Sequence, residues 1–386
     1  MNPRLEKLQP YPFERMRANL AGVVPDPKLK PIDLSIGEPK HPTPQFIKDA
    51  LVASLEGLAA YPRSIGLIEL RKGISEWLAR RYGIPAPDPE TQILPINGSR
   101  EALFAFAQTV IDPTSGARVV SPNPFYQIYE GAALLAGATP VYAENLLELE
   151  DWSGVQLAYV CSPGNPTGKV MSLEEWKKLF DLQDRHGFII ASDECYSELY
   201  YKQPSLGGLQ AAFQLGRSFR NLVVFSSLSK RSNVPGMRSG FVAGDAALLK
   251  AFLLYRTYHG SAMSVSVQKA SIAAWGDEKH VEENRRLYAA KYKAVLPLIK
   301  APLEADMPDG AFYLWMRTPI DDRDFARGLY EKANVLVLPG SFLSREVVVN
   351  ERRHNPGRNR LRVALVAPLA ECVEAAGRIM DFARTL

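Results

Sequence analysis

Residues 222–243 read LVVFSSLSKRSNVPGMRSGFVA, and this stretch decides both the fold and the candidate site. It begins with the apolar run 222–226 and ends with the apolar run 241–243, and each run predicts a buried strand. The turn between them carries Lys230 and Arg238 among serines and glycines. Because polar residues after a buried strand lie at the carboxyl edge of an α/β sheet, the turn is a candidate ligand site.

The side chains of this turn suit a ligand that has both a carbonyl group and a phosphate. A lysine amine such as that of Lys230 forms an imine with an aldehyde when burial and nearby cations lower its pKa. Arg238 and the hydroxyls of Ser227 and Ser229 offer hydrogen bonds to a dianionic phosphate. A surface loop with a chance lysine has the same composition, so this segment alone leaves both interpretations open.

Two further apolar runs, 157–161 and 188–192, also end in polar residues. The segment SPGNPTG follows the first run, and its prolines and glycines fix a turn that presents Asn165. The segment DECY follows the second run, where Asp193 can pair with a protonated ring nitrogen and Tyr196 can donate to a ring oxygen. An ordinary strand-to-helix turn and a helix cap are the alternatives.

The segment NGSRE, residues 97–101, opens a predicted helix at 102–110. Free backbone N–H groups at a helix start bind phosphate, and simple capping by Ser99 is the alternative. Each of the four segments is a weak signal by itself. Their order predicts that one sheet edge gathers them.

The middle of the chain alternates short apolar runs with amphipathic stretches, which predicts βαβ units and a mainly parallel sheet. One helix is bounded by the capping box of Ser172 and Glu175 and by Gly187. Another fits residues 67–82, whose apolar stripe ends before Gly83.

The last part of the chain has a different pattern. A long charged helix at about 278–300 precedes a strand-like segment at 311–316, which we expect to be a core strand rather than a source of a substrate-facing aromatic. We therefore predict a large domain at 46–277 and a smaller α+β domain at 278–386. Residues 1–45 are expected to form an arm that joins the smaller domain.

Composition and charge exclude several classes of protein. Hydrophobic residues make up 46% and charged residues 23%, as in ordinary globular proteins. The formal charge of +4 comes from basic residues interleaved with acidic ones, so we expect no nucleic-acid partner. The three cysteines indicate no disulfide framework, and no spacing predicts a metal site. Neither a signal peptide nor a membrane-spanning run is visible, and we expect a cytoplasmic protein.

Taken together, the segments SPGNPTG, DECY and SLSK…GMRSG resemble the class I and II aminotransferases of the fold-type I pyridoxal-phosphate enzymes. The resemblance covers essentially the whole chain, and it extends to LSIGEP (34–39), YPRSIG (61–66), PNPFYQIY (122–129) and NRLRVAL (359–365). It implies an α/β fold whose large domain has a mainly parallel, seven-stranded sheet between helices. It also implies pyridoxal 5'-phosphate as cofactor and a small-molecule amino donor and 2-oxo acid as substrates.

The resemblance implies a role for each residue that touches the cofactor ring. Lys230 corresponds to the Schiff-base lysine, Asp193 to the partner of the pyridine nitrogen, and Tyr196 to the partner of the ring oxygen O3′. Asn165 also contacts O3′ and the substrate. Tyr126 is expected to stack on the ring.

The resemblance also implies residues for the phosphate and the substrate. Arg362 corresponds to the arginine that binds the substrate α-carboxylate, with Gly37 beside it. Tyr61 corresponds to a tyrosine that reaches the phosphate of the neighbouring subunit, which implies a homodimer with shared active sites. The residues expected around the phosphate are Gly98, Ser99, Arg100, Ser227, Ser229 and Arg238.

One branch is more similar still, the proteobacterial N-succinyl-LL-diaminopimelate aminotransferases of lysine and peptidoglycan-precursor synthesis. The resemblance includes NPRLEKLQPYPFERMRANLAGV, SIGEPKHPTP, NGSREALFAFAQ and LRVALVAPLAECVEAA. Residues 144–155 look shorter than is usual in that branch, and we expect a trimmed surface loop there. The extra carboxylates of such a substrate require cations near the mouth of the site, and the candidates are Lys40, Arg63, Arg231 and Arg256.

Other functions stay open on the sequence alone. The same lysine and phosphate site serves aminotransferases of aspartate, aromatic or acetylornithine type. It also serves pyridoxal-phosphate-dependent carbon–sulfur lyases and ring-closing enzymes. A regulator that only senses the cofactor is disfavoured, since the short N-terminal arm leaves no room for a DNA-binding segment.

Overall fold

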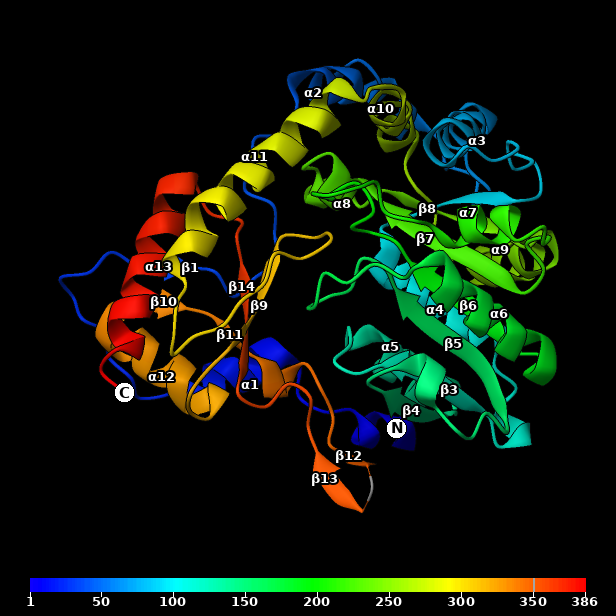
Figure 1. Ribbon diagram of the computed structural model, residues 1–386. Helices are drawn as coiled ribbons and strands as arrows, with labels where there is room; N and C mark the ends of the chain where they lie inside the picture. Colours follow the sequence, from blue (N-terminus) through cyan, green and yellow to red (C-terminus); the bar gives the residue numbers. More distant parts are fainter. Residues whose placement is uncertain (350) are drawn as a thin grey trace.

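The computed structural model describes residues 1–349 and 351–386. Its centre is a seven-stranded sheet in the order β2-β8-β7-β6-β5-β3-β4 (Figure 1). The neighbouring strands β7, β6, β5, β3 and β4 pair in parallel, and β8 runs antiparallel to both of its neighbours. The predicted mainly parallel sheet is therefore confirmed. The strands are β2 (Ile93–Ile96), β3 (Arg118–Pro122), β4 (Thr139–Ala143), β5 (Val155–Cys161), β6 (Ile189–Asp193), β7 (Leu222–Ser227) and β8 (Gly240–Gly244).

Helices cover both faces of this sheet, and each face has its own hydrophobic core. Successive residues of a strand point to opposite faces, so Val224 belongs to the core that includes Trp77 and Trp176, and Val223 to the core that includes Phe106 and Tyr159. Burial on both faces explains why these strands read as continuous apolar runs. The helices are α3 (Ile68–Tyr82), α4 (Ser99–Val110), α5 (Ile128–Ala136), α6 (Leu173–His186), α7 (Gly208–Gln214), α8 (Leu228–Arg231), α9 (Ala246–His259) and α10 (Val265–Gly276).

The predicted helix boundaries hold where a cap defines them. The capping box of Ser172 and Glu175 starts α6, and Gly187 ends it with a φ of 75°. The alternative interpretation of NGSRE, simple capping by Ser99, does not hold, because Ser99 is already the first residue of α4. The capping position belongs to Gly98, whose φ of 81° favours glycine.

A second, smaller sheet has the order β11-β14-β9, and its pairs are antiparallel. Its strands are β9 (Tyr313–Arg317), β11 (Leu338–Pro339) and β14 (Arg360–Ala364). Helices α12 (Asp322–Ala333) and α13 (Leu369–Ala383) pack with this sheet around a separate hydrophobic core. The remaining short elements are α1 (Pro12–Asn19), α2 (Gln45–Val52), β1 (Ile32–Asp33), β10 (Val335–Leu336), β12 (Val347–Val349) and β13 (Arg352–His354).

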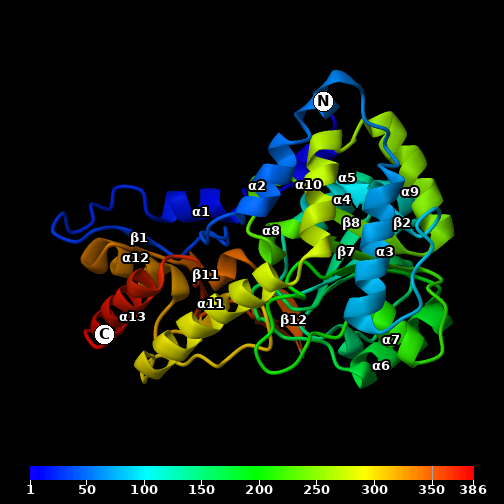
Figure 2. The same cartoon turned by 90° about the horizontal axis from the view of Figure 1, so that it is seen from above.

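The N-terminal segment lies against this second unit. Strand β1 pairs in parallel with β10, and α1 lies next to β11. Helix α11 (Lys279–Val295) runs from beside α8 to α13 (Figures 1 and 2). It is shorter than the predicted 278–300, because Pro297 lies in a 3₁₀ turn that follows Val295 and proline cannot continue a helix. The domain boundaries at 45 and 277 stay predictions.

The described part of the chain contains no helix that is long and apolar enough to cross a membrane. Its three cysteines, Cys161, Cys195 and Cys372, are free thiols. The cytoplasmic location stays a prediction.

Candidate active site

The site lies where the carboxyl ends of β5, β6 and β7 meet the start of β8. Two adjoining cavities of about 160 and 420 Å³ open there, and they share Ser99, Arg100, Tyr126, Cys195 and Lys230. The first cavity is also lined by Gly37, Asn165, Asp193, Tyr196 and Arg362, and the second by Ser227, Ser229 and Arg238. The structure thus brings together the residues expected to bind the cofactor and the α-carboxylate, with Gly98 packed against Arg238 and Tyr61 as the exception.

Lys230 lies in the short helix α8, directly after β7, and its amine points into the first cavity. Its Nζ donates a hydrogen bond to the Gly37 carbonyl at 2.6 Å. Burial lowers the pKa of the Lys230 amine to about 8, and the positive charges of Arg362 and Arg238 act in the same direction. A lysine with such a pKa is neutral often enough near pH 8 to act as a nucleophile or a base.

Asp193 ends β6 and is buried at the floor of the first cavity. Its carboxylate accepts hydrogen bonds from Tyr129 Oη at 2.7 Å and from the Cys195 N–H at 3.3 Å. Burial raises the pKa of Asp193, because the charged carboxylate is poorly solvated there. A cationic partner would offset that cost. Tyr129 stacks on Tyr159, with 4.5 Å between the ring centroids. The sequence did not single out Tyr129, because its position in the pattern indicates only a buried residue of a helix.

Two facing tyrosines also line the first cavity. Tyr196 Oη and Tyr313 Oη lie 2.8 Å apart, and both side chains are buried. Tyr313 belongs to β9, so the segment 311–316 supplies both a core strand and an aromatic that lines the site. The expectation that it would serve only the core was wrong.

Arg362 projects from β14 into the same cavity and is almost fully buried. Its Nη1 donates to Asn165 Oδ1 at 3.1 Å, and its Nη2 donates to the Ser35 carbonyl at 2.8 Å. Among the described residues, its Nε has no hydrogen-bond partner. The guanidinium lies over the Tyr313 ring at 4.6 Å from the centroid. A buried guanidinium with a free donor fits a substrate carboxylate.

The second cavity has the groups expected around a phosphate. Ser227 Oγ accepts a hydrogen bond from the Ser229 N–H at 3.1 Å, and the two hydroxyls lie 2.9 Å apart. Arg238 adopts a left-handed backbone conformation with φ of 52°. Gly98 has a φ of 81°, which favours glycine, and a Cβ atom there would lie 2.3 Å from Arg238 Nη2 and would displace that guanidinium.

Arg100 lies at the mouth, and its exposed side chain borders both cavities. Its Nε donates to Tyr126 Oη at 2.7 Å, and its Nη2 donates to Tyr11 Oη at 3.4 Å. The guanidinium is thus held toward the substrate side by two phenols. The contact between Arg100 and the cofactor phosphate, expected from the sequence, stays a prediction. Tyr11 was not singled out from the sequence, because nothing local marks a residue of the N-terminal arm as part of the site.

Two of the cations expected at the mouth lie elsewhere. Arg231 is 1% exposed and lies between Trp77 and Trp275, and Arg256 is also 1% exposed. Their guanidinium groups pair with the carboxylates of Glu278 and Glu101, at 2.6 and 2.7 Å. These two expectations were wrong, because both side chains are buried in the protein interior and pair with carboxylates there. Lys40 and Arg63 are exposed but do not line either cavity.

Tyr61 does not reach the site of its own chain. Its side chain is fully exposed, and it lines neither of the two cavities. No group of three or more His, Cys, Asp or Glu that could hold a metal ion occurs among residues 1–349 and 351–386.

Several known proteins are similar to this chain in fold and in sequence. The family described as "Aminotransferase class I and II" matches residues 30–379. A solved aminotransferase from Neisseria meningitidis Z2491 is 53% identical, with a TM-score of 0.95 and full coverage of both chains. An LL-diaminopimelate aminotransferase of Aquifex aeolicus is 30% identical and covers 98% of each chain. A probable aminotransferase of Mycobacterium tuberculosis is 33% identical over 93% of this chain and 82% of its own length.

The fold and the site define an enzyme that transfers amino groups. More narrowly, the chain belongs to the class I and II aminotransferases. The cofactor of this family is pyridoxal 5'-phosphate, and the predicted fold class and cofactor are thereby confirmed. The residues present fit that cofactor: a buried amine for the aldehyde, a buried carboxylate for the ring nitrogen, and serine hydroxyls with Arg238 for the phosphate.

The lowered pKa of Lys230 gives a test on the cofactor-free protein. We expect acylation of Lys230 by an amine-reactive reagent, followed by mass spectrometry, to show a midpoint near pH 8 instead of the ordinary 10.5. Arg362→Leu should move this midpoint upward, because it removes a cation that disfavours the ammonium form. A midpoint above about 10 in the unmodified chain would contradict the described burial of the amine.

Proposed function

We propose that the chain transfers the amino group of N-succinyl-LL-2,6-diaminopimelate to 2-oxoglutarate, which gives N-succinyl-2-amino-6-oxopimelate and glutamate in lysine and diaminopimelate biosynthesis. The observation that carries the proposal is a pair of guanidinium groups, Arg362 and Arg100, that line one cavity. Such a pair suits a donor with an α-carboxylate and at least one distal carboxylate. The relatives named LL-diaminopimelate aminotransferase support a donor of this shape.

The roles of the site residues follow from their surroundings. Bound pyridoxal phosphate supplies an aldehyde and a ring that accepts electrons. Asp193 holds a positive charge at the ring nitrogen, since a buried carboxylate is stabilised by a cation. The Lys230 amine, with its pKa near 8, would take the proton from the substrate Cα and pass it to the aldehyde carbon of the cofactor. Arg362 orients the α-carboxylate through its free Nε.

Replacement of the lysine tests the catalytic assignment. We expect Lys230→Ala to keep the fold, measured by circular dichroism and thermal unfolding, and to lose at least about 10²–10⁴-fold in turnover, because it removes the base. The exposed Lys177 offers a control, and Lys177→Ala should keep full activity. Substantial multiple-turnover activity in Lys230→Ala would refute the role of this amine.

Replacement of Arg100 tests the donor. For N-succinyl-LL-diaminopimelate, Arg100→Ala should lower kcat/KM about 10–100-fold, which corresponds to the loss of a charge-assisted hydrogen bond. With alanine as donor and saturating pyridoxal phosphate the same variant should change little, and Arg80→Ala, an exposed arginine of α3, serves as control. The measurement is a coupled glutamate assay that compares succinyl-diaminopimelate with aspartate, aromatic, acetylornithine and alanine donors. A higher kcat/KM for any of the others would overturn the substrate proposal, and 2-oxo acid formation without glutamate would indicate a lyase.

We further infer a homodimer with shared active sites. The fully exposed Tyr61 follows a segment with other exposed apolar side chains, Val52 at 65%, Leu55 at 49% and Leu58 at 69%. Helix α9 adds Tyr258 at 89% exposure. Four of these side chains fall within residues 52–61, and exposed apolar side chains gathered in one segment support an interface there. Sedimentation should give about twice the chain mass of 42.8 kDa, and Tyr61→Phe should weaken cofactor binding; a monomer would contradict the inference.

A further inference from the structure

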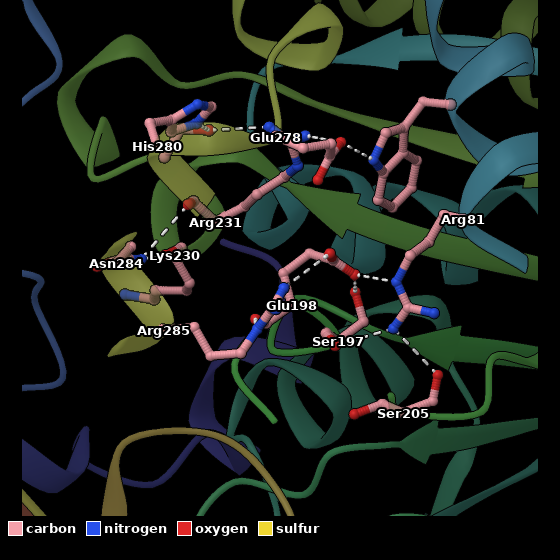
Figure 3. A network of polar contacts seen from close by, with 12 residues as sticks. Arg81, Ser197, Glu198, Ser205, Lys230, Arg231, Glu278, His280, Asn284 and Arg285 are labelled. Carbon is pink, nitrogen blue, oxygen red and sulfur yellow. Dashed lines mark hydrogen bonds and ion pairs between the residues drawn. The ribbon is translucent and has the colours of Figure 1, made fainter. Parts of the chain in front are cut away.

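The first two turns of α11 contact the segment that carries the reactive lysine. Figure 3 shows these contacts in one network, with Asn284 beside Lys230 and with Glu278 and His280 beside the residues that follow it. At the other end of α11, Tyr292 and Val295 pack into the hydrophobic core beside the small sheet. One helix therefore links the lysine segment to the small sheet. The hydrogen bonds join Glu278 to Arg231 at 2.6 Å, His280 to Ser232 at 2.8 Å and Asn284 to Lys230 at 3.0 Å.

Asn284 is the centre of these contacts, and it is only 2% exposed. Its Nδ2 donates to the carbonyl oxygens of Lys230 at 3.0 Å and Arg231 at 3.4 Å. Its Oδ1 accepts from Asn233 Nδ2 at 3.1 Å and from His41 Nδ1 at 2.9 Å. Because carbonyls only accept, these partners fix the orientation of the amide and place the His41 proton on Nδ1. Both donors and the acceptor oxygen of the side chain are in use.

These bonds complete a closed loop around Lys230. The amine end of the side chain is bonded to the Gly37 carbonyl, and the backbone end is bonded through Asn284 to His41. Gly37 and His41 belong to the same short N-terminal segment. Both ends of the lysine are therefore held against one segment. Asn284 connects the Lys230 carbonyl to His41, and Thr43 Oγ1 donates to the Asn233 carbonyl at 2.8 Å, three residues further along the turn.

We propose that Asn284 is a positioning residue that fixes the backbone of Lys230 relative to residues 37–41. The amine then returns to the same place each time it is released from the cofactor and has to accept or deliver a proton. This inference rests on the proposed role of Lys230. A misplacement of about 1 Å at a reacting group costs about 10²-fold in rate, so loss of Asn284 should lower turnover far more than it lowers binding.

The test uses the holoenzyme and a matched pair of variants. Asn284→Asp keeps the size of the side chain but removes both donors. Asn334→Asp makes the same change at another buried asparagine, whose Nδ2 donates to the Leu29 carbonyl at 2.7 Å in the second unit. We expect Asn284→Asp to lose about 10²-fold in kcat with KM within about threefold, and Asn334→Asp to keep kcat.

A second readout separates positioning from stability. After borohydride reduction, mass spectrometry gives the fraction of bound pyridoxal phosphate that is linked to Lys230. This fraction should be complete in the unmodified enzyme and in Asn334→Asp, and reduced in Asn284→Asp at equal cofactor content. An unchanged fraction together with an unchanged kcat would overturn the inference. No trapping at Lys230 in the unmodified enzyme would instead overturn the proposed function.

A milder variant covers the case in which Asn284→Asp does not fold. His41→Phe removes the Nδ1 donor but keeps a ring against Tyr288, whose centroid lies 4.4 Å from that of His41. We expect kcat to fall about tenfold, which is the loss of one hydrogen bond, with the linked fraction also reduced. Tyr288→Phe is the control, because the Tyr288 hydroxyl has no partner among the described residues. Equal kcat and equal trapping in His41→Phe and Tyr288→Phe would overturn the inference.

Discussion

The hydrogen bond between Lys230 Nζ and the Gly37 carbonyl is the contact on which the rest of the site depends. It joins residues that are 193 positions apart, and it brings the N-terminal segment over the edge of the large sheet. Position 37 has no room for a side chain in this arrangement, because a Cβ there would lie 2.0 Å from the Oη of the buried Tyr313. Desolvation of the Lys230 amine lowers its pKa to about 8, so a large share of the amine is uncharged and reactive near that pH.

The part of the site that follows strands could be predicted from the sequence. Buried parallel strands read as apolar runs, and the polar residue after each run must lie at the carboxyl edge of the sheet. Asn165, Asp193 and Lys230 are found there for that reason. The same logic predicted the parallel sheet, and the capping residues of α6 predicted its ends.

The rest depends on contacts between segments that are distant in sequence. Arg231 and Arg256 look like ordinary surface cations until the structure shows the tryptophans and carboxylates that enclose them. Tyr313 lies on a strand whose pattern fits a core, and only the approach of β9 to the segment that follows β6 reveals its contact with Tyr196. The direction of the Arg100 side chain is likewise set by Tyr11, a residue of the arm.

The two halves of the site are encoded in different ways. Ser227, Ser229, Lys230 and Arg238 occupy one contiguous stretch, so a single turn fixes the spacing between the covalent anchor and the phosphate. The groups that face the donor come from scattered segments of the chain. Substitutions in the scattered segments therefore leave the spacing between Lys230 and the phosphate groups unchanged. An aminotransferase with this fold can therefore change its amino donor through substitutions in the scattered segments, while the turn that holds the lysine and the phosphate groups stays the same.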